Sequence, residues 1–475
     1  MLRPQHHCFP FPHNSGRGFQ IQLCKMLLII FSLAVGALLY YMFMRKNPQT
    51  IPEGDGWWGE GDRRASEVDD EPIEPFKIEV SEQMIQDLHS RLDNTRFTPS
   101  LEGSSFHYGF NSTYLRKLVA YWRKDYDWQK QVEHLNTFPH FKTKIEGIQV
   151  HFVHVKPVVG AARPLMMIHG WPGSFYEFYK VIAQLTEPGA QLGGFEVVCP
   201  SIPGYGFSEA PCRPGFNSLA AARVFHKLMR RLGLERYYVH GGDWGGLIAT
   251  NMAQMKPENV KGIHLNFFPV SRLGLQHLPS VILGPYLPSL MGFTRTDVER
   301  MFPFVQKNIY TLLRESGYMH IQGTKPDTVG SALNDSPAGL AAYILEKFSS
   351  WTSLGFQDLE DGGLDRKFSL DELLTNVMIY WVTGSITSSM RMYKENLGVN
   401  PMSRIDAKVG VHVPAGLAAF PNELMHVPLV WAKQKYKRIV SYSYMSRGGH
   451  FAAFEEPQMI VDDLVRFIRC VEKSG

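Results

Sequence analysis

The stretch that decides the fold is HGGDWGG, residues 240–246. It follows a strand-like run at residues 236–240 and precedes an apolar helical run at residues 247–255. A strand, a glycine-rich turn and a helix in this order place the residue at the apex of the turn above a sheet, where its side chain is free to react. The apex residue is Asp243, so the pattern predicts a carboxylate nucleophile. Taken alone, the turn fits equally well a helix that Asp caps at its N-terminus.

The sequence around this turn alternates between short strands and helices, which predicts a mostly parallel sheet with helices on its faces. A hairpin is expected at residues 141–155, and single strands are expected at residues 165–168, 195–199, 236–240, 260–265, 409–413 and 439–445. Between about residues 271 and 403, Leu, Met, Tyr and Phe recur at helical spacing instead. A helical lid is therefore expected to interrupt the sheet.

The loop after the strand at residues 165–168 reads HGWPGS, residues 169–174. In a fold that carries its nucleophile on a sharp turn, this loop and the residue after the nucleophile supply backbone N–H groups that bind a developing oxyanion. Trp171 and Trp244 are therefore the expected donors of the oxyanion hole. A simple turn at Pro172 and Gly173 explains the composition but gives no reason for the loop to follow that strand.

A nucleophile on this fold needs a later acid and then a histidine, in that chain order. His450 follows the last expected strand, so it is the expected base. Glu423 follows the strand at residues 409–413 and falls at the sheet edge that carries the nucleophile, where its carboxylate can bind His450. Asp406 is the rival acid, but it precedes that strand and so falls at the opposite edge.

Five motifs in this order and spacing resemble the microsomal epoxide hydrolase family. They are HGWPGS, PGYGFS, GGDWGG, FPNELMH and RGGHFAAFEEP, which begin at residues 169, 203, 241, 420 and 447. The resemblance covers nearly the whole chain from about residue 26 onward. It implies an α/β-hydrolase fold with an inserted helical lid, an N-terminal helical region and one N-terminal transmembrane helix.

The same resemblance implies roles for the site residues. Asp243 would be the nucleophile, His450 the base and Glu423 its acid partner. Tyr318 in ESGYMHI and Tyr393 in RMYKENLG match the two lid tyrosines with which the family holds the epoxide oxygen. Without the resemblance, both would count as ordinary aromatic residues among 20 tyrosines.

The chemistry of a carboxylate nucleophile also points to an epoxide. Attack on a strained, electrophilic carbon gives an ester that water can hydrolyse, whereas attack on a carboxylic ester would give a reactive anhydride. This chemistry requires no cofactor and no metal. A haloalkane dehalogenase is the alternative enzyme, but a halide leaves without a proton, while an epoxide oxygen needs acidic donors such as Tyr318 and Tyr393. A binding module on an inactive hydrolase fold would lack at least one of the expected catalytic residues. All of them are present in this sequence.

An uncharged run of 19 residues, MLLIIFSLAVGALLYYMFM, occupies residues 26–44 between Lys25 and Arg45. About 20 apolar residues cross a hydrocarbon core, so the run is expected to be a membrane anchor. The bulky Tyr41 and Phe43 at its end argue against a cleaved signal peptide. Positive charges on both sides leave the orientation open. The resemblance implies the endoplasmic reticulum membrane with the catalytic domain facing the cytosol, where the glycosylation sequon at Asn111 would stay unused.

These features divide the chain into six segments: an N-terminal extension (1–25), the anchor (26–44), a linker and N-terminal helical region (45–140), the first part of the α/β-hydrolase core (141–270), the helical lid (271–403) and the second part of the core (404–475). The linker, residues 47–70, is rich in Pro, Gly and acidic residues and contains the pair Trp57 and Trp58, which is expected to be exposed. Helices are expected from Phe76 to about Phe138.

Composition excludes several other classes of protein. A net charge of +4 over 475 residues, without a Lys/Arg stripe, gives no reason to expect a nucleic-acid partner. Five scattered cysteines without C-x-x-C spacing fit neither a disulfide framework nor a zinc site, which favours a reducing compartment. The expected partners are an apolar epoxide of xenobiotic or lipid origin, water, and membrane lipid around the anchor.

Overall fold

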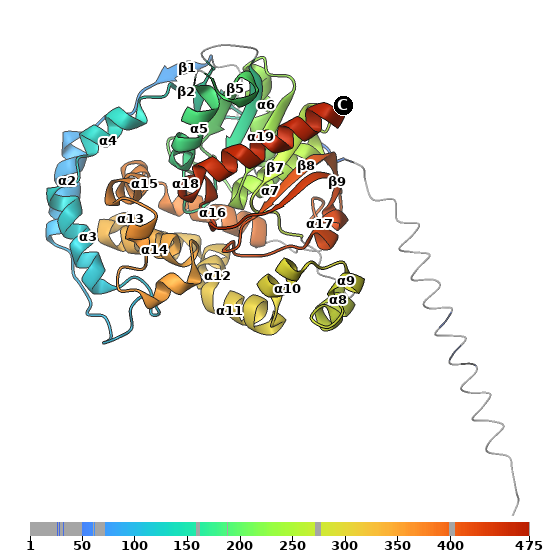
Figure 1. Ribbon diagram of the computed structural model, residues 1–475. Coiled ribbons are helices and arrows are strands. Elements are labelled where there is room, and N and C mark those ends of the chain that lie inside the picture. The colour runs from blue at the N-terminus through green and yellow to red at the C-terminus, as the bar shows by residue number, and fades with distance from the viewer. Residues whose placement is uncertain are drawn as a thin grey trace, which may run out of the picture. The chain divides into compact units, whose positions relative to one another are not determined.

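The computed structural model describes residues 26, 28, 32, 50–59, 61, 72–157, 162–187, 189–270, 277–398 and 404–474. The chain divides into two compact units, Met1–Pro48 and Gln49–Gly475. The strands and helices named below belong to the second unit, which we call the catalytic unit (Figure 1). Among the described residues, no helix is both long and apolar enough to cross a membrane. The anchor predicted at residues 26–44 lies outside the described residues except at positions 26, 28 and 32.

The described residues of the catalytic unit form a nine-stranded sheet with the order β1-β2-β3-β5-β4-β6-β7-β8-β9. The strands are β1 (Glu74–Phe76), β2 (His140–Ile145), β3 (Ile148–Val155), β4 (Arg163–Ile168), β5 (Phe195–Pro200), β6 (Tyr237–Gly241), β7 (Val260–Leu265), β8 (Val411–Ala419) and β9 (Tyr436–Tyr444). The pairs β1–β2, β2–β3 and β3–β5 are antiparallel. The remaining pairs, from β5 through β4 to β9 in the sheet order, are parallel. The expected hairpin and strands are present, although β8 extends six residues beyond its expected end at Val413 and so reaches to within four residues of Glu423.

Helices cover both faces of the sheet, so its central strands are buried on both sides and consist of apolar runs such as RPLMMI in β4. The helices α5 (Tyr179–Thr186) and α19 (Pro457–Ser474) pack together, and Figure 1 shows α19 lying across β7 and β8. The helices α6 (Ser218–Arg231) and α7 (Asp243–Met255) also pack together, and α7 contacts four strands from β4 to β8. The sheet thus provides a rigid support for the turn at the start of α7.

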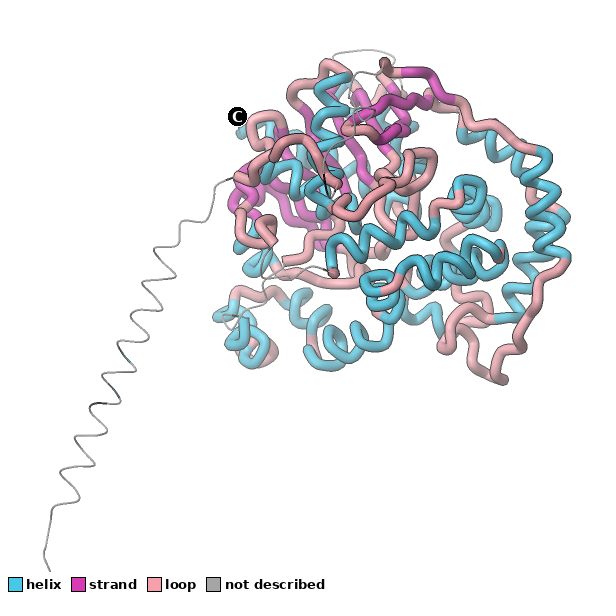
Figure 2. The backbone as a smooth tube through the Cα atoms, turned by 180° about the vertical axis from the view of Figure 1, so that it is seen from behind, coloured by secondary structure: helices cyan, strands magenta, loops and turns pink. Residues whose placement is uncertain are grey.

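The N-terminal helical region wraps around the outside of the lid, as both views show (Figures 1 and 2). It consists of α2 (Glu82–Asp93), α3 (Ser112–Lys124) and α4 (Trp128–Leu135). The expectation of helix from Phe76 onward is wrong at its start, because residues 74–76 pair with β2 as the edge strand β1. Tyr114 and Tyr121 donate hydrogen bonds to lid carboxylates, at 2.7 Å to Asp365 and 2.8 Å to Asp371.

The described part of the linker is a strap that packs on the catalytic unit. The N–H of Ile51 donates to the carbonyl of Gln254 at 3.0 Å, and the Trp58 indole N–H donates to the carbonyl of Glu146 at 3.1 Å. The expectation that both tryptophans are exposed is wrong, since Trp58 is buried and Trp57 is half-buried. The buried Trp58 ring and the hydrogen bond of its indole N–H hold the strap on the catalytic unit. The composition of the linker alone does not show these contacts.

Helices fill the interval between β7 and β8. They are α8 (Leu278–Leu283), α9 (Pro288–Met291), α10 (Arg295–Met301), the π-helix η4 (Val305–Tyr310), α11 (Thr311–Glu315), α12 (Gly317–Thr324), α13 (Pro326–Asp335), α14 (Pro337–Ser350), α15 (Leu370–Thr383) and α16 (Ile386–Leu397). Those from α12 to α16 lie against the core above the carboxyl ends of the strands, and α8 to α11 form the lower edge in Figure 1.

Candidate active site

Asp243 occupies a strained turn between β6 and α7. Its φ angle is +47°, in the left-handed region that non-glycine residues rarely adopt. The turn needs glycine beside it, because a Cβ atom on Gly245 would lie 1.9 Å from the Ile168 carbonyl oxygen, and one on Gly241 would lie 2.4 Å from the Gly245 backbone. The neighbouring strand and helix hold this strain, and the Asp243 side chain projects from the turn at the carboxyl edge of the sheet.

The loop after β4 binds the Asp243 carboxylate. The backbone N–H of Trp171 donates to Asp243 Oδ1 at 2.8 Å, and a Cβ atom on Gly170 would lie 2.3 Å from that same oxygen. Trp244 is in the first turn of α7, where backbone N–H groups have no acceptor within the helix. No hydrogen bond from its N–H to Asp243 is formed among the described residues. Of the two expected oxyanion donors, the structure therefore shows Trp171 in contact with the carboxylate, while Trp244 directly follows Asp243 in the chain.

His450 lies between two carboxylates. Its Nδ1 is 2.5 Å from Glu423 Oε1, and its Nε2 is 3.5 Å from Asp243 Oδ2. Both His450 and Glu423 side chains are buried. Asp406, the rival acid, instead forms an ion pair with Arg404 at 2.8 Å. The structure thus brings together Asp243, His450 and Glu423, the three residues that the sequence predicts as nucleophile, base and acid.

The loop of His450 is held by a further carboxylate. Glu455 accepts hydrogen bonds from the N–H groups of Gly449 at 2.8 Å and Phe451 at 2.9 Å. Burial raises the pKa of Glu455 to about 7, although these two N–H groups lower it. The N–H of His450 itself donates to the Trp351 carbonyl at 3.0 Å. Backbone hydrogen bonds on both sides of His450 therefore fix the position of its ring.

The electrostatics of the site favour protonated His450 in the resting protein. Burial alone would lower the pKa of His450, but the negative charges of Glu423 and Asp243 outweigh burial and hold that pKa well above its usual range.

The two lid tyrosines reach the same site from different helices. The Tyr318 ring, at the start of α12, stacks on Trp171 with a centroid distance of 5.4 Å and an interplanar angle of 4°. The Tyr393 ring, in α16, meets the Trp244 ring edge-on at 4.8 Å. The Tyr393 hydroxyl is buried and has no hydrogen-bond partner among the described residues. Burial raises the pKa of both phenols, and the charge of Asp243 raises them further, so both keep their protons at neutral pH.

A small cavity of about 20 Å³ lies beside Asp243 and His450. That volume is enough for about one water molecule. Asn266 and Glu177 also line the cavity. Burial raises the pKa of Glu177 to about 8; the charge of Asp243 also raises it, while His450 lowers it. Sequence reasoning missed Glu177, and the signal that could have shown it is its place in the helical turn directly after the oxyanion loop.

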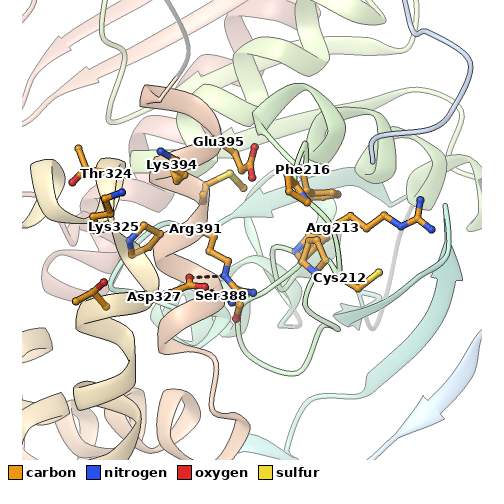
Figure 3. A pocket seen from close by; sticks show the side chains of 16 residues that line it. Cys212, Arg213, Phe216, Thr324, Lys325, Asp327, Ser388, Arg391, Lys394 and Glu395 are labelled. Carbon is orange, nitrogen blue, oxygen red and sulfur yellow. Dashed lines mark hydrogen bonds and ion pairs between the residues drawn. The ribbon is translucent and has the colours of Figure 1, made fainter. Parts of the chain in front are cut away.

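A larger hollow of about 520 Å³ opens at the surface between α12, α13, α16 and the loop at residues 203–216 (Figure 3). Both polar and apolar side chains line it, and the lining residues Arg391 and Asp327 form an ion pair at 2.8 Å. None of Asp243, His450, Glu423, Tyr318 and Tyr393 lines it. The chemistry therefore belongs to the small cavity and not to this hollow. The described residues contain no cluster of His, Cys, Asp and Glu that could hold a metal ion.

The fold and the site define an α/β-hydrolase whose sharp turn carries a carboxylate in place of a hydroxyl or thiol. Two family profiles match the chain, "Epoxide hydrolase N terminus" over residues 73–178 and "alpha/beta hydrolase fold" over residues 163–396. The chain is 57% identical to epoxide hydrolase 1 of Sus scrofa and 55% identical to that of Oryctolagus cuniculus, over 94% of this chain and 100% of each relative.

Among solved structures, juvenile hormone epoxide hydrolase from the silkworm Bombyx mori is similar with a TM-score of 0.83 at 40% identity, covering 88% of this chain and 99% of that chain. The chain belongs to the epoxide hydrolase family, and it is an enzyme. The resemblance that the five motifs indicate is confirmed, and so is the α/β-hydrolase fold.

Proposed function

We propose that this epoxide hydrolase converts apolar epoxides, of xenobiotic or lipid origin, into vicinal diols through a covalent ester of Asp243. The observation that carries the proposal is the position of one carboxylate among groups of different function. Its Oδ1 accepts the Trp171 N–H, its Oδ2 lies 3.5 Å from His450 Nε2, and the rings of the lid tyrosines pack on Trp171 and Trp244. Turnover of a styrene-type epoxide to its diol, without turnover of a haloalkane, is the test against a dehalogenase.

In the first step, Asp243 Oδ2 attacks an epoxide carbon and the carbon–oxygen bond of the ring breaks. The ring oxygen leaves as an alkoxide and takes a proton from the tyrosine pair. Tyr393 suits this role because its buried hydroxyl has no other partner among the described residues. Oδ1 stays bound to the Trp171 N–H and becomes the carbonyl oxygen of the ester.

In the second step, a water molecule loses a proton to His450 Nε2 and attacks the carbonyl carbon of the Asp243 ester. The negative charge that develops on Oδ1 is stabilised by the N–H groups of Trp171 and Trp244. The intermediate then releases the diol, whose alkoxide oxygen takes the proton from His450. The carboxylic acid left at Asp243 gives up its proton, the tyrosine that protonated the ring oxygen regains one, and the Asp243 carboxylate is restored. One water is consumed for each epoxide opened.

Ester formation itself prepares His450 for the second step. The charge of Asp243 is one of the causes that raise the pKa of His450 in the resting protein. When Asp243 becomes a neutral ester, that contribution disappears, so the pKa of His450 falls and the imidazole can lose its proton. Glu423 then stabilises the imidazolium that forms again during hydrolysis.

We also propose that residues 26–44 anchor the enzyme in the endoplasmic reticulum membrane as a single-pass helix, with the catalytic unit facing the cytosol. The uncharged run and its flanking cations support an anchor. We further propose the six segments given under "Sequence analysis", with the lid at residues 271–403 between the two parts of the core.

The lid tyrosines should act on ring opening and not on ester hydrolysis. We expect Tyr318→Phe or Tyr393→Phe to slow alkylation of Asp243, with a general-acid contribution of about 10²–10⁴-fold, and the double variant to lose more than either single one. Single-turnover kinetics with a chromophoric epoxide separate the two steps. Tyr343→Phe is a suitable control, because Tyr343 lies on α14 beside Trp171 and is bound to Gln322. Unchanged alkylation rates in both single variants and in the double variant would remove Tyr318 and Tyr393 from the mechanism.

Glu177 should position the hydrolytic water. We expect Glu177→Ala to slow ester hydrolysis by about 10²-fold, at the low end for a proton-transfer network, and to leave the alkylation rate nearly unchanged. Glu177→Gln keeps the volume of the side chain but cannot titrate, so any change in the hydrolysis rate near pH 8 should disappear in it. A variant that slows alkylation and hydrolysis equally would indicate that Glu177 only supports the fold.

The anchor should be separable from catalysis, because every site residue lies beyond residue 160. A chain that lacks residues 1–48 should keep the turnover number of the full chain to within a few-fold in detergent. The cut falls before Ile51 because that side chain is buried against the catalytic unit. Circular dichroism of both chains shows whether they are folded. A folded shortened chain without turnover would contradict the separation.

A further inference from the structure

Exposed apolar side chains are concentrated on one part of the lid. Of the 20 large hydrophobic side chains that are exposed among the described residues, 11 lie between residues 278 and 313. They are Leu278, Ile282, Leu283, Tyr286, Leu287, Leu290, Val305, Ile309, Tyr310, Leu312 and Leu313, and we call them the outer apolar face. Soluble proteins expose such side chains singly, so a dense group marks a surface that binds a partner.

The outer apolar face is built with helical spacing. Leu278 and Ile282 lie four residues apart in α8, Tyr286 lies in the turn after it and Leu290 lies in α9, while Val305, Ile309 and Leu313 follow one another at intervals of four along η4 and α11. Figure 1 shows these helices at the lower edge of the catalytic unit. Other side chains of the same segment, such as Phe293 and Met301, are buried in the core. The segment therefore carries apolar side chains on its buried side and also on its exposed side. A helix whose outer side met only water would carry polar residues there.

The charges around this face suit a lipid surface. Residues 278–294 contain no charged side chain. Exposed cationic side chains then follow at Arg295, Lys307 and Arg314, and Arg295 pairs with the exposed Glu299 at 2.8 Å. An uncharged helical surface with bulky apolar residues and Lys or Arg at its border is typical of segments that lie in the membrane interface.

The outer apolar face is close to the start of the catalytic unit, and the short helix α17 (Leu429–Lys435) joins the two places. At one end of α17, the Trp431 indole N–H donates to Ser280 of α8 at 3.2 Å. At the other end, Lys435 donates to the carbonyl of Asp406, whose neighbour Ile405 packs on the cluster that contains Ile51. A helix of seven residues is about 10 Å long. The strap therefore begins about one short helix away from the outer apolar face.

The uncharged run at residues 26–44 ends five residues before Thr50 in the sequence. We propose that the outer apolar face lies in the interface of the same lipid bilayer, so that the catalytic unit is a second point of membrane attachment. This inference rests on the proposed anchor at residues 26–44.

Membrane contact at this face has a consequence for catalysis. Tyr318 begins α12 directly after α11, so one of the proposed proton donors follows the outer apolar face in the chain. The loop after Glu423 exposes Leu424 and Met425, and His426 of that loop contacts Asp297 of α10 at 2.7 Å. An apolar epoxide dissolved in the bilayer would therefore meet the lid next to the site without first entering water.

The test uses the full chain in phosphatidylcholine vesicles. Every cysteine except the buried Cys199 is replaced by serine, and single cysteines at Leu290, Leu313 and Tyr108 receive a nitroxide label. Tyr108 is the control because it is 82% exposed and lies in the N-terminal helical region, outside the set of residues that forms the outer apolar face. Collision with lipid-soluble oxygen and with a water-soluble nickel chelate is measured for each label, and turnover shows that each labelled protein is folded.

We expect labels at Leu290 and Leu313 to collide mainly with oxygen and the label at Tyr108 mainly with nickel. Collision with nickel at all three positions, in protein that floats with the vesicles, would overturn the inference and leave the anchor intact. Protein that does not float would overturn both proposals. Labels at Leu290 and Leu313 that are shielded from both reagents, in detergent as well as in vesicles, would show that a second copy of the chain covers the face instead.

A kinetic measurement also tests whether the outer apolar face contacts the bilayer. Replacing Leu290 and Leu313 by Asp in the full chain should raise KM several-fold for an epoxide that partitions into the vesicles and leave kcat/KM unchanged for a water-miscible epoxide. Equal loss for both substrates would point to damage of the lid and would contradict the inference.

Discussion

His450→Gln is expected to stop the catalytic cycle at the ester. The variant keeps Asp243 as a nucleophile and keeps both tyrosines, so alkylation should proceed. Glutamine cannot take a proton from water, so hydrolysis of the ester should fall by at least about 10⁴-fold. Steady-state turnover should then be lost, while mass spectrometry of digested protein should find a peptide containing Asp243 that has gained the mass of the substrate.

His107→Gln is the matched control for this variant, because His107 is not a site residue and its partly exposed side chain pairs with Asp358 at 2.9 Å. It should turn over substrate normally and accumulate no adduct. Loss of turnover in His450→Gln without any modified peptide, in folded protein, would show that His450 is needed before the ester forms.

Asp243→Asn should abolish both steps. An amide is a poor nucleophile, and removal of the nucleophile from a catalytic set typically lowers the rate by about 10⁶-fold. Asparagine tolerates the left-handed backbone of this turn better than most residues and can still accept the Trp171 N–H, so the fold should be kept. The rate of diol formation and the absence of a modified peptide check the expectation.

Asp335→Asn is the corresponding control, since Asp335 is exposed and pairs with Arg91, and neither of these two residues belongs to the site. Its turnover should equal that of the parent protein. Substantial diol formation by folded Asp243→Asn protein would mean that water attacks the epoxide directly and that Asp243 is not required for covalent chemistry.

Much of the site could be predicted from local sequence, because its main parts are tied to strand ends. Asp243, Trp171 and His450 each follow a strand through a glycine-rich turn, and the order of parallel strands brings such turns to one edge. The prediction of Glu423 over Asp406 used the same argument, and in the structure Glu423 is the one that contacts His450.

Other parts could not be read from local pattern. Tyr318 and Tyr393 lie on lid helices, where a buried aromatic residue at helical spacing looks the same whether it packs or reacts, so they depended on the family resemblance. Glu177 and Trp58 acquire their roles from partners distant in the chain, and Trp58 in a Gly-rich linker was expected to be exposed for that reason. The six additional residues of β8 form because β9 continues alongside all of them and β7 alongside residues 415–417, which the sequence of a single strand does not specify.

The most direct measurement of the covalent mechanism is a single turnover in ¹⁸O-labelled water with enzyme in excess over epoxide. If Asp243 attacks the epoxide, the new oxygen of the first diol comes from the carboxylate, so the diol is unlabelled and the label appears in the peptide that contains Asp243. If His450 activates water that attacks the epoxide directly, the first diol carries the label and the peptide does not. The account predicts the first result, and label in the diol of the first turnover would contradict it.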